Sequence, residues 1–192
     1  MSSAAGKIEQ KRLATDDWEK AALRMMAEGG INAVAVEPLA RQLGVTKGSF
    51  YWHFANRKAL IEAALLRWET DDREQLLQAM GSSGDARERL RQLFFSSARH
   101  YRSHALFHSL SQSSEHELVY PVLRRVSRRR LELLTSAFEQ LGMQREQARH
   151  RARLTYAAYA GYVQLAFLHQ SEAGAGSEFE AYIQHTVDTL IP

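Results

Sequence analysis

Several things that the chain lacks narrow its function before any motif is considered. It has no cysteine, which excludes disulfides, thiol catalysis and cysteine-ligated zinc. The most apolar stretch runs from Leu154 to Leu168 and contains Gln164, so it falls short of the ~20 apolar residues of a membrane span. The opening residues MSSAAGKIEQKRLATDD have no apolar core for a signal peptide. We therefore expect a cytoplasmic protein that has no membrane partner.

Motifs of common enzyme classes are also missing. The sequence has no glycine-rich phosphate loop, no nucleophile elbow and no HExxH zinc motif. No pattern indicates a catalytic residue or a cofactor. A helical enzyme that uses the histidines and carboxylates remains an alternative, but it is the weaker one.

Positive charge is concentrated in the first third of the chain. Nine lysines and arginines face six acidic residues up to Lys58, whereas the rest of the chain carries 16 residues of each sign. A polyanion such as DNA would dock at the basic end of a protein. The surplus is small, so it supports a motif without replacing one.

Two short helices joined by a tight turn are predicted between Val36 and Leu60. Apolar residues recur at helical spacing up to Leu43, and Gly44 stands where a helix commonly ends in a left-handed residue. Thr46 is a suitable N-cap for the second helix, in which Phe50 and Phe54 share one face. The remaining side chains of that short helix then face solvent. We interpret this exposed surface as one that reads DNA.

At these residues the sequence resembles the tetracycline-repressor (TetR-type) family of bacterial regulators. LARQLGV is similar to the family's first helix and turn, TKGSFYWHF to its recognition helix, and NRKAL to the start of the next helix. The likeness covers roughly Asp16 to Glu62. The resemblance implies that Lys47, Gly48 and Ser49 face base edges and that Arg57 meets a phosphate. The DNA-binding residues that it implies are Thr46, Lys47, Gly48, Ser49, Tyr51, Trp52, His53 and Arg57.

The predicted fold is all-α with about nine helices. Residues 1–58 would form a three-helix DNA-binding helix-turn-helix domain, and residues 59–192 a helical ligand-binding and dimerisation domain. Residues 1–14 are either an arm that reaches the minor groove or a tail with stray charges. Asp16 with Glu19, Asn56 and Asp85 are the expected helix caps.

Histidines and arginines in the second domain allow two interpretations each. His100, His104 and His108 are four residues apart, but Ser103 should break the helix, so partly buried polar groups are favoured over a metal site. For the basic run from Arg124 to Arg130, a solvated face with Arg128 paired to Glu132 is favoured over a contact for an anionic ligand.

A small-molecule pocket in the second domain is a hypothesis. Aromatic, hydroxyl and imidazole groups on inward helix faces suit an apolar, aromatic or weakly acidic compound. The candidate residues are Ser97, His100, Tyr101, Phe107, His108, Tyr156 and Tyr159.

The last two helices have the pattern of an assembly surface. The first carries small residues such as Ala157 and Gly161, and the second has an apolar stripe from Phe179 to Leu190. These features and the resemblance together predict a homodimer that binds double-stranded DNA at a palindromic operator. They also predict a repressor that a small-molecule effector, of unknown identity, releases from that operator. An architectural DNA-binding protein without ligand control is the alternative.

Overall fold

A computed structural model describes residues 14–81, 84–98, 101–168 and 177–191. Within these residues the chain is entirely helical and forms nine α-helices and one 3-10 turn, which confirms the predicted fold class. The helices are α1 (Thr15–Gly29), α2 (Val36–Gln42), α3 (Lys47–Phe50), α4 (Arg57–Gly81), α5 (Ala86–Ala98), α6 (Tyr101–Gln112), α7 (Val119–Gln140), α8 (Arg145–Leu168) and α9 (Ser177–Leu190), with the 3-10 turn η1 at Ile31–Ala33. In this part of the chain no helix is both long enough and apolar enough to cross a membrane.

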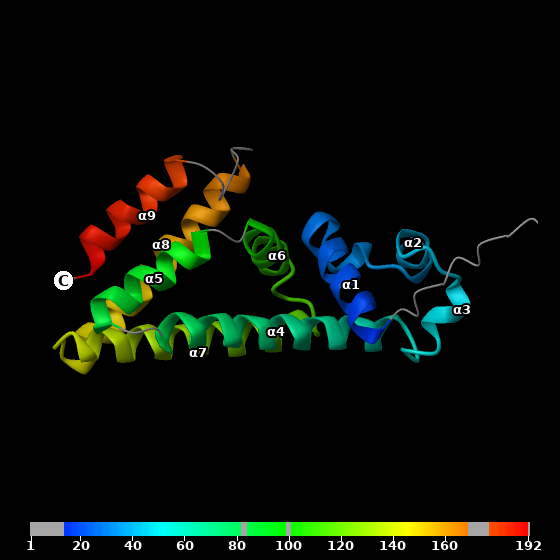
Figure 1. The fold of residues 1–192 in the computed structure, drawn as a ribbon, viewed down its shortest axis with the longest axis horizontal. Helices are drawn as coiled ribbons and strands as arrows, with labels where there is room; N and C mark the ends of the chain where they lie inside the picture. Colours follow the sequence, from blue (N-terminus) through cyan, green and yellow to red (C-terminus); the bar gives the residue numbers. More distant parts are fainter. Residues whose placement is uncertain (1–13, 82–83, 99–100, 169–176, 192) are drawn as a thin grey trace, which may run out of the picture.

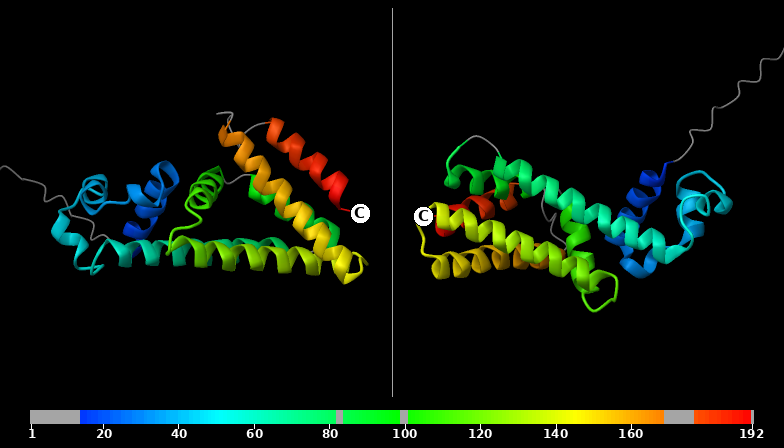
Figure 2. Two further views of the ribbon diagram at one scale, coloured as in Figure 1. Left: turned by 180° about the vertical axis from the view of Figure 1, so that it is seen from behind. Right: turned by 90° about the horizontal axis from the view of Figure 1, so that it is seen from below.

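The molecule is elongated along α4. Helices α1, α2 and α3 gather at one end, while α5, α8 and α9 gather at the other (Figure 1). Helix α4 runs from the first group into the second, α7 lies alongside it, and α6 lies between the two groups (Figures 1 and 2). Any change in the position of α4 therefore acts on both ends of the molecule.

The turn between α2 and α3 forms as the sequence predicts. Gly44 has a φ of +70°, and the amide of Val45 beyond it donates to the Ala40 carbonyl at 2.9 Å. Only glycine adopts this backbone conformation readily. Helix α3 is shorter than expected, because the bonds from Trp52 to Ser49 and from His53 to Phe50 continue it as tighter turns.

Three of the expected caps can be compared with the structure. The Asn56 side chain accepts from the Ala59 amide at 2.9 Å, and Asp85 accepts from the Glu88 amide at 2.8 Å, so both caps are confirmed. The capping box of Asp16 with Glu19 is wrong. Asp17 instead bonds the Ala14 amide at 2.9 Å, while Asp16 and Glu19 both accept from Arg67 of α4.

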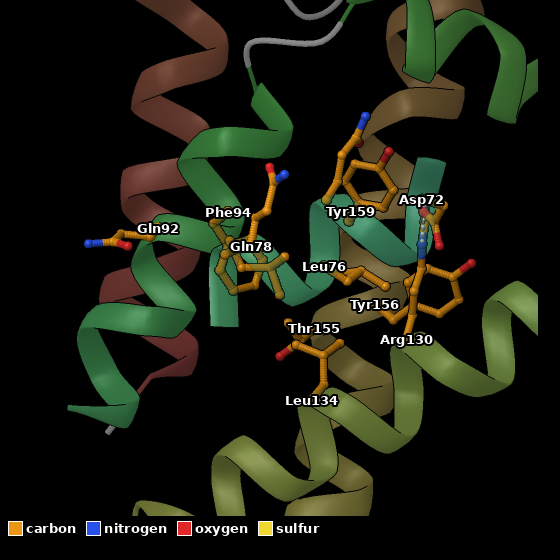
Figure 3. A pocket seen from close by; sticks show the side chains of 13 residues that line it. Asp72, Leu76, Gln78, Gln92, Phe94, Arg130, Leu134, Thr155, Tyr156 and Tyr159 are labelled. Atoms are coloured by element: carbon orange, nitrogen blue, oxygen red, sulfur yellow. Dashed lines mark hydrogen bonds and ion pairs between the residues drawn. The ribbon is translucent and has the colours of Figure 1, made fainter. Parts of the chain in front are cut away.

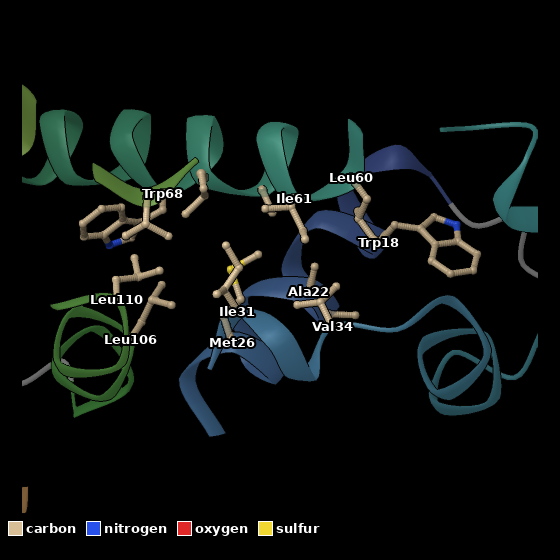
Figure 4. Packing of buried hydrophobic residues seen from close by; sticks show 14 of the residues in the cluster. Trp18, Ala22, Met26, Ile31, Val34, Leu60, Ile61, Trp68, Leu106 and Leu110 are labelled. Carbon is tan, nitrogen blue, oxygen red and sulfur yellow. The ribbon is translucent and has the colours of Figure 1, made fainter. Parts of the chain in front are cut away.

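One hydrophobic core extends from the helix-turn-helix end into the middle of the molecule. Trp18 and Met26 of α1 pack beneath α4, and Leu106 and Leu110 of α6 continue the same cluster (Figure 4). Trp18, Met26 and Leu110 are completely buried. Trp18, Ala21, Ala22 and Met26 recur at helical spacing along α1, but nothing in the sequence shows that α6 packs against the same core.

A second core joins α5, α7, α8 and α9. It contains Leu90, Phe138, Ala148, Ile183 and Val187, all of which are buried. Ile183, Val187 and Leu190 of the α9 stripe are thus covered within the chain, whereas the Phe179 side chain lies outside the described residues. The expectation that this stripe remains available for assembly is wrong, because α5 and α8 already pack against it.

Arginines of α7 tie that helix to α4. Arg125 and Arg129 bond the Glu69 carboxylate at 2.6 and 3.1 Å, and Arg130 pairs with Asp72. The hydrogen bonds from Arg125 hold the pKa of Glu69 below its ordinary value. The basic run is therefore not a wholly solvated face, although the exposed pair of Arg128 with Glu132 forms as predicted, at 3.9 Å.

Arg57 ties the first turn of α4 to the chain that precedes α2. Its Nε donates to the Val34 carbonyl at 2.5 Å, and an Nη donates to the Ile31 carbonyl at 2.8 Å. The side chain is half-buried. The Val34 carbonyl thereby gains a donor, and the Ile31 carbonyl at the start of η1, which also accepts from the Val34 amide at 3.4 Å, gains a second one.

We predict that Arg57→Ala destabilises the helix-turn-helix end. Two hydrogen bonds from a charged donor are lost, so the free energy of unfolding should fall by about 2 kcal/mol in urea titrations. The matched control is Lys58→Ala, which removes an exposed side chain 3.5 Å from Glu117 and should change stability by less than about 0.5 kcal/mol. Equal stability of the two variants would contradict the structural role of Arg57.

Candidate DNA-binding surface and ligand pocket

Large aromatic side chains stand out into solvent beside α3. Trp52 is 89% exposed and Tyr51 is 57% exposed. Phe50 precedes them and Phe54 follows them in the sequence; both are buried, and their rings stack with centroids 5.7 Å apart. Phe50 also meets the Trp18 ring edge-on at 5.4 Å. The inner face anchors the turn, so its outer face presents tryptophan and tyrosine in fixed positions.

Lys47 at the start of α3 forms an ion pair with a residue that the sequence analysis missed. Its Nζ lies 2.8 Å from Oε1 of Glu37, and both side chains are exposed. The hydrogen bond raises the pKa of Lys47 and lowers that of Glu37. The only sequence signal for Glu37 is its place in the first turn of α2, where an acidic residue also suits the helix dipole.

The other predicted DNA-binding residues divide into outward and inward groups. Thr46 and Gly48 are exposed and Ser49 is half-buried, so all three border the open surface. A Cβ atom added at Gly48 would meet only the Thr46 hydroxyl, at 3.6 Å, and the protein itself leaves that space free. Thr46 occupies the N-cap position, but its side chain makes no capping hydrogen bond.

His53 and Arg57 point back into the protein. The His53 Nδ1 lies 3.2 Å from the Thr15 hydroxyl of α1. Two of the Arg57 nitrogens are occupied by the carbonyls described above. Only the remaining Arg57 donors are free of those bonds, so a phosphate contact by this residue stays a prediction.

A pocket of about 460 Å³ lies among α4, α5, α7 and α8. Apolar side chains and a few polar groups face it together (Figure 3). Its lining is Asp72, Gln75, Leu76, Gln78, Ala79, Gln92, Leu93, Phe94, Arg130, Leu134, Thr155, Tyr156 and Tyr159. This volume and the combination of apolar and polar side chains suit a small organic ligand.

The predicted ligand residues are only partly brought together. Tyr156 and Tyr159 line the pocket, and Phe107 packs behind them with its ring centroid 5.8 Å from that of Tyr159. His108 lies elsewhere, stacked on Phe167 at 4.4 Å. His100 and the side chains of Ser97 and Tyr101 lie outside the described residues.

Asp72 and Arg130 form a buried ion pair in the pocket wall. Arg130 is also covered by the rings of Phe107, Tyr156 and Tyr159, whose centroids are 5.3, 5.9 and 5.8 Å from its guanidinium carbon. Burial alone would lower the pKa of Arg130, but the Asp72 carboxylate outweighs it, and the pKa lies above its ordinary value. The acidic residue within the apolar stripe of α4 was a sequence signal that we overlooked.

The histidines of α6 have individual partners. Nδ1 of His104 lies 3.0 Å from the Tyr159 hydroxyl, and His104 is buried. Helix α5 ends at Ala98 and α6 begins at Tyr101, so a new helix starts before His104 as expected, but Ser103 lies within that helix and does not cap it. No group of three metal-ligating side chains occurs among the residues that the structure describes.

The comparisons with known proteins agree with this geometry. Residues 20–64 match the model of the bacterial regulatory proteins of the tetR family. The class A tetracycline repressor of transposon 1721 from Escherichia coli is 41% identical over 44 residues, which are 23% of this chain and 20% of that protein. The class D repressor from Escherichia coli is 32% identical over 72 residues, which are 38% and 33%. The chain thus matches a fifth to a third of the length of these relatives.

Solved structures extend the likeness to the whole fold. A TetR transcriptional regulator from Legionella pneumophila has a TM-score of 0.81 at 17% identity, over 95% of this chain and all of that one. A regulator from Saccharomonospora viridis in complex with choline has a TM-score of 0.76 at 17% identity, over 91% and 93%. Residues 20–64 thus match the N-terminal domain of the tetR family of bacterial regulatory proteins, and the chain as a whole shares the all-helical fold of solved transcriptional regulators.

Proposed function

We propose that the chain is a dimeric transcriptional repressor that leaves a palindromic operator when a small molecule enters its pocket. The observation that carries the proposal is the exposed surface of Lys47, Tyr51 and Trp52 on a helix-turn-helix unit. A tryptophan that is 89% exposed gains little for the fold. Aromatic and cationic side chains held rigidly on such an element suit contacts with bases and phosphates.

We propose that residues 1–58 bind DNA and that residues 59–192 bind the ligand and form the dimer. Helix α4 begins at the boundary and carries Asp72 and Leu76 into the pocket. Arg67 of the same helix holds Asp16 and Glu19 of α1. A ligand that shifts α4 would therefore turn α1 and the recognition surface with it.

The exposed face of α8 is the proposed dimer contact. Leu154 and Leu165 are each 55% exposed and Leu168 is 65% exposed, and they recur at helical spacing with the exposed Gly161. A stripe of this kind on the surface marks an interaction site. Because the α9 stripe is covered within the chain, α8 supplies the apolar part of the contact and α9 at most its border.

Simultaneous binding of both subunits to DNA explains how a ligand would release the operator. Two recognition helices of a symmetric dimer must match two half-sites about one helical turn apart, roughly 34 to 36 Å. A change in their separation weakens both contacts at once. The choline complex of the Saccharomonospora viridis regulator supports small-molecule binding by this fold.

We predict that Lys47→Ala relaxes the preference for one base pair in each half-site. A lysine that reaches the O6 and N7 acceptors of guanine gives about 1 to 3 kcal/mol of discrimination. Binding sites should be selected from a random duplex pool with the wild type and with the variant. Anisotropy titrations on the selected and a scrambled duplex should then be run at two salt concentrations.

The matched control for that experiment is Lys20→Ala. Lys20 is 51% exposed against 52% for Lys47, and it also pairs with a carboxylate, that of Asp16 at 2.7 Å. The control should leave the selected sequence unchanged. If Lys47→Ala selects the same sequence as the wild type and loses equal affinity on both duplexes, Lys47 adds only charge.

We predict that Gly161→Leu weakens the dimer by roughly 1 to 3 kcal/mol through overpacking at the contact. A Cβ atom at Gly161 meets nothing within 4 Å inside the protomer, so the protomer itself should keep its stability. Gly81→Leu is the control, since Gly81 is exposed and its surroundings are equally open. If sedimentation shows that the wild-type protein is a monomer at micromolar concentration, this assembly is ruled out.

A further inference from the structure

The Asp72–Arg130 ion pair separates two cavities. On one side is the pocket described above, and on the other is a cavity of about 520 Å³ lined mainly by α1, α4 and α6, with Arg130 of α7 and Phe167 of α8. Asp72, Gln75 and Arg130 line both cavities, and Leu23, Arg24, Ala27 and Glu28 of α1 line only the second. A ligand that reaches the ion pair therefore reaches the wall that faces the DNA-binding end.

Two buried oxygen atoms in the pocket wall have no hydrogen-bond partner. Oδ1 of Asp72 accepts from Arg130, but Oδ2 accepts from nothing, and the residue is only 7% exposed. The hydroxyl of Thr155, which is 1% exposed, is also unpaired. Both side chains line the pocket, Asp72 beside Arg130 and Thr155 near Leu134 (Figure 3). An unmet buried acceptor is unfavourable, so a ligand that supplies a donor there removes a cost that the empty pocket carries.

The rest of the lining sets the shape of the ligand. Leu76, Ala79, Phe94 and Leu134 offer an apolar wall, and Gln75, Gln78 and Gln92 add amide groups. An apolar body is required along that wall, because polar groups placed there would lose their hydration. The donor must therefore stand at one end of an otherwise apolar molecule.

A carboxylate ligand fits this site poorly. Nε and one Nη of Arg130 both donate to Oδ1 of Asp72, and three aromatic rings surround the guanidinium. An anion that took Arg130 would leave the Asp72 carboxylate buried without its partner, and a stranded buried charge is strongly unfavourable. The structure thus argues against the weakly acidic compound that the sequence allowed.

We infer that the pocket binds an uncharged amphiphile whose hydroxyl or N–H group donates to Oδ2 of Asp72, and that it discriminates against carboxylates. The inference rests on the proposed function only in naming the class of effector. The ligand would engage α4 at the residue that also faces α1.

Three probes with one body test the ligand class on the full chain. para-Butylphenol carries the donor, para-butylanisole replaces it by a methyl ether, and para-butylbenzoate carries an anion. Isothermal titration should show the phenol binding about tenfold or more tighter than the anisole, with the benzoate weakest. Equal affinity for phenol and anisole, or a preference for the benzoate, would overturn the inference. So would the absence of binding by all three probes.

Two variants place the binding in this pocket. Thr155→Val keeps the shape and removes a hydroxyl that lies away from Asp72, so it is the control and should leave the phenol and anisole affinities unchanged. Asp72→Asn frees Arg130 from its charged partner, so it should invert the preference and favour the benzoate. If Asp72→Asn does not fold, Ala79→Leu, which narrows the apolar wall of the pocket, decides instead, and an unchanged phenol affinity in that variant counts against the inference.

DNA titrations with and without the phenol separate this inference from the proposed function. Phenol binding that leaves operator affinity unchanged supports the ligand class and contradicts ligand-controlled release. A wild type that selects no DNA sequence but prefers the phenol contradicts the regulator and still supports the ligand class. A wild type that binds an operator but shows no preference among the probes overturns the inference alone.

Discussion

The pairing of α4 carboxylates with α7 arginines is the interaction on which the rest of the structure depends. Glu69 and Asp72 are each 7% exposed, and a buried carboxylate without a cation would not be tolerated there. Arg125, Arg129 and Arg130 meet them from one side of α7. These pairs fix how α7 lies along α4, and both helices contribute walls of the pocket. Removing one partner would leave the other charge buried and unpaired. The pairs therefore favour one arrangement of α4 and α7, while their net contribution to stability is small.

Helix α4 also links the two ends of the molecule through apolar packing. Trp68 and Leu65 belong to the core that contains Trp18 of α1, while Leu76 and Ala79 face the pocket. Arg67, which lies between Leu65 and Trp68 in the sequence, adds charged contacts to α1. A rigid helix anchored in this way moves as a unit. This shared helix is the physical basis of the proposed coupling between the pocket and the α3 end of the molecule.

The recognition surface shows how burial on one face produces exposure on the other. Phe50 and Phe54 fill the space against Trp18, which fixes the direction of the chain between them. Tyr51 and Trp52 must then point outward. The pair of Lys47 with Glu37 keeps a cation at the start of α3 while lowering the net charge of that surface. The paired Lys47 and Glu37 carry no net charge together, so this pair orients the lysine without making the surface more basic.

Short-range physics let the sequence alone determine much of this protein. Helical periodicity, the left-handed Gly44, the caps at Asn56 and Asp85, and the inner face of Phe50 with Phe54 all depend on neighbours within one or two turns. The resemblance at the recognition helix followed from the same residues.

Only the tertiary structure decided which partner a long side chain finds. Arg130 meets Asp72 across 58 positions of sequence, and Arg57 turns to carbonyls 23 and 26 positions away instead of outward. The α9 stripe, which the sequence left open for a second subunit, is covered by α5 from about ninety residues earlier in the chain. A helical pattern tells which face is apolar, but packing between distant helices decides what covers that face and where a cavity remains between them.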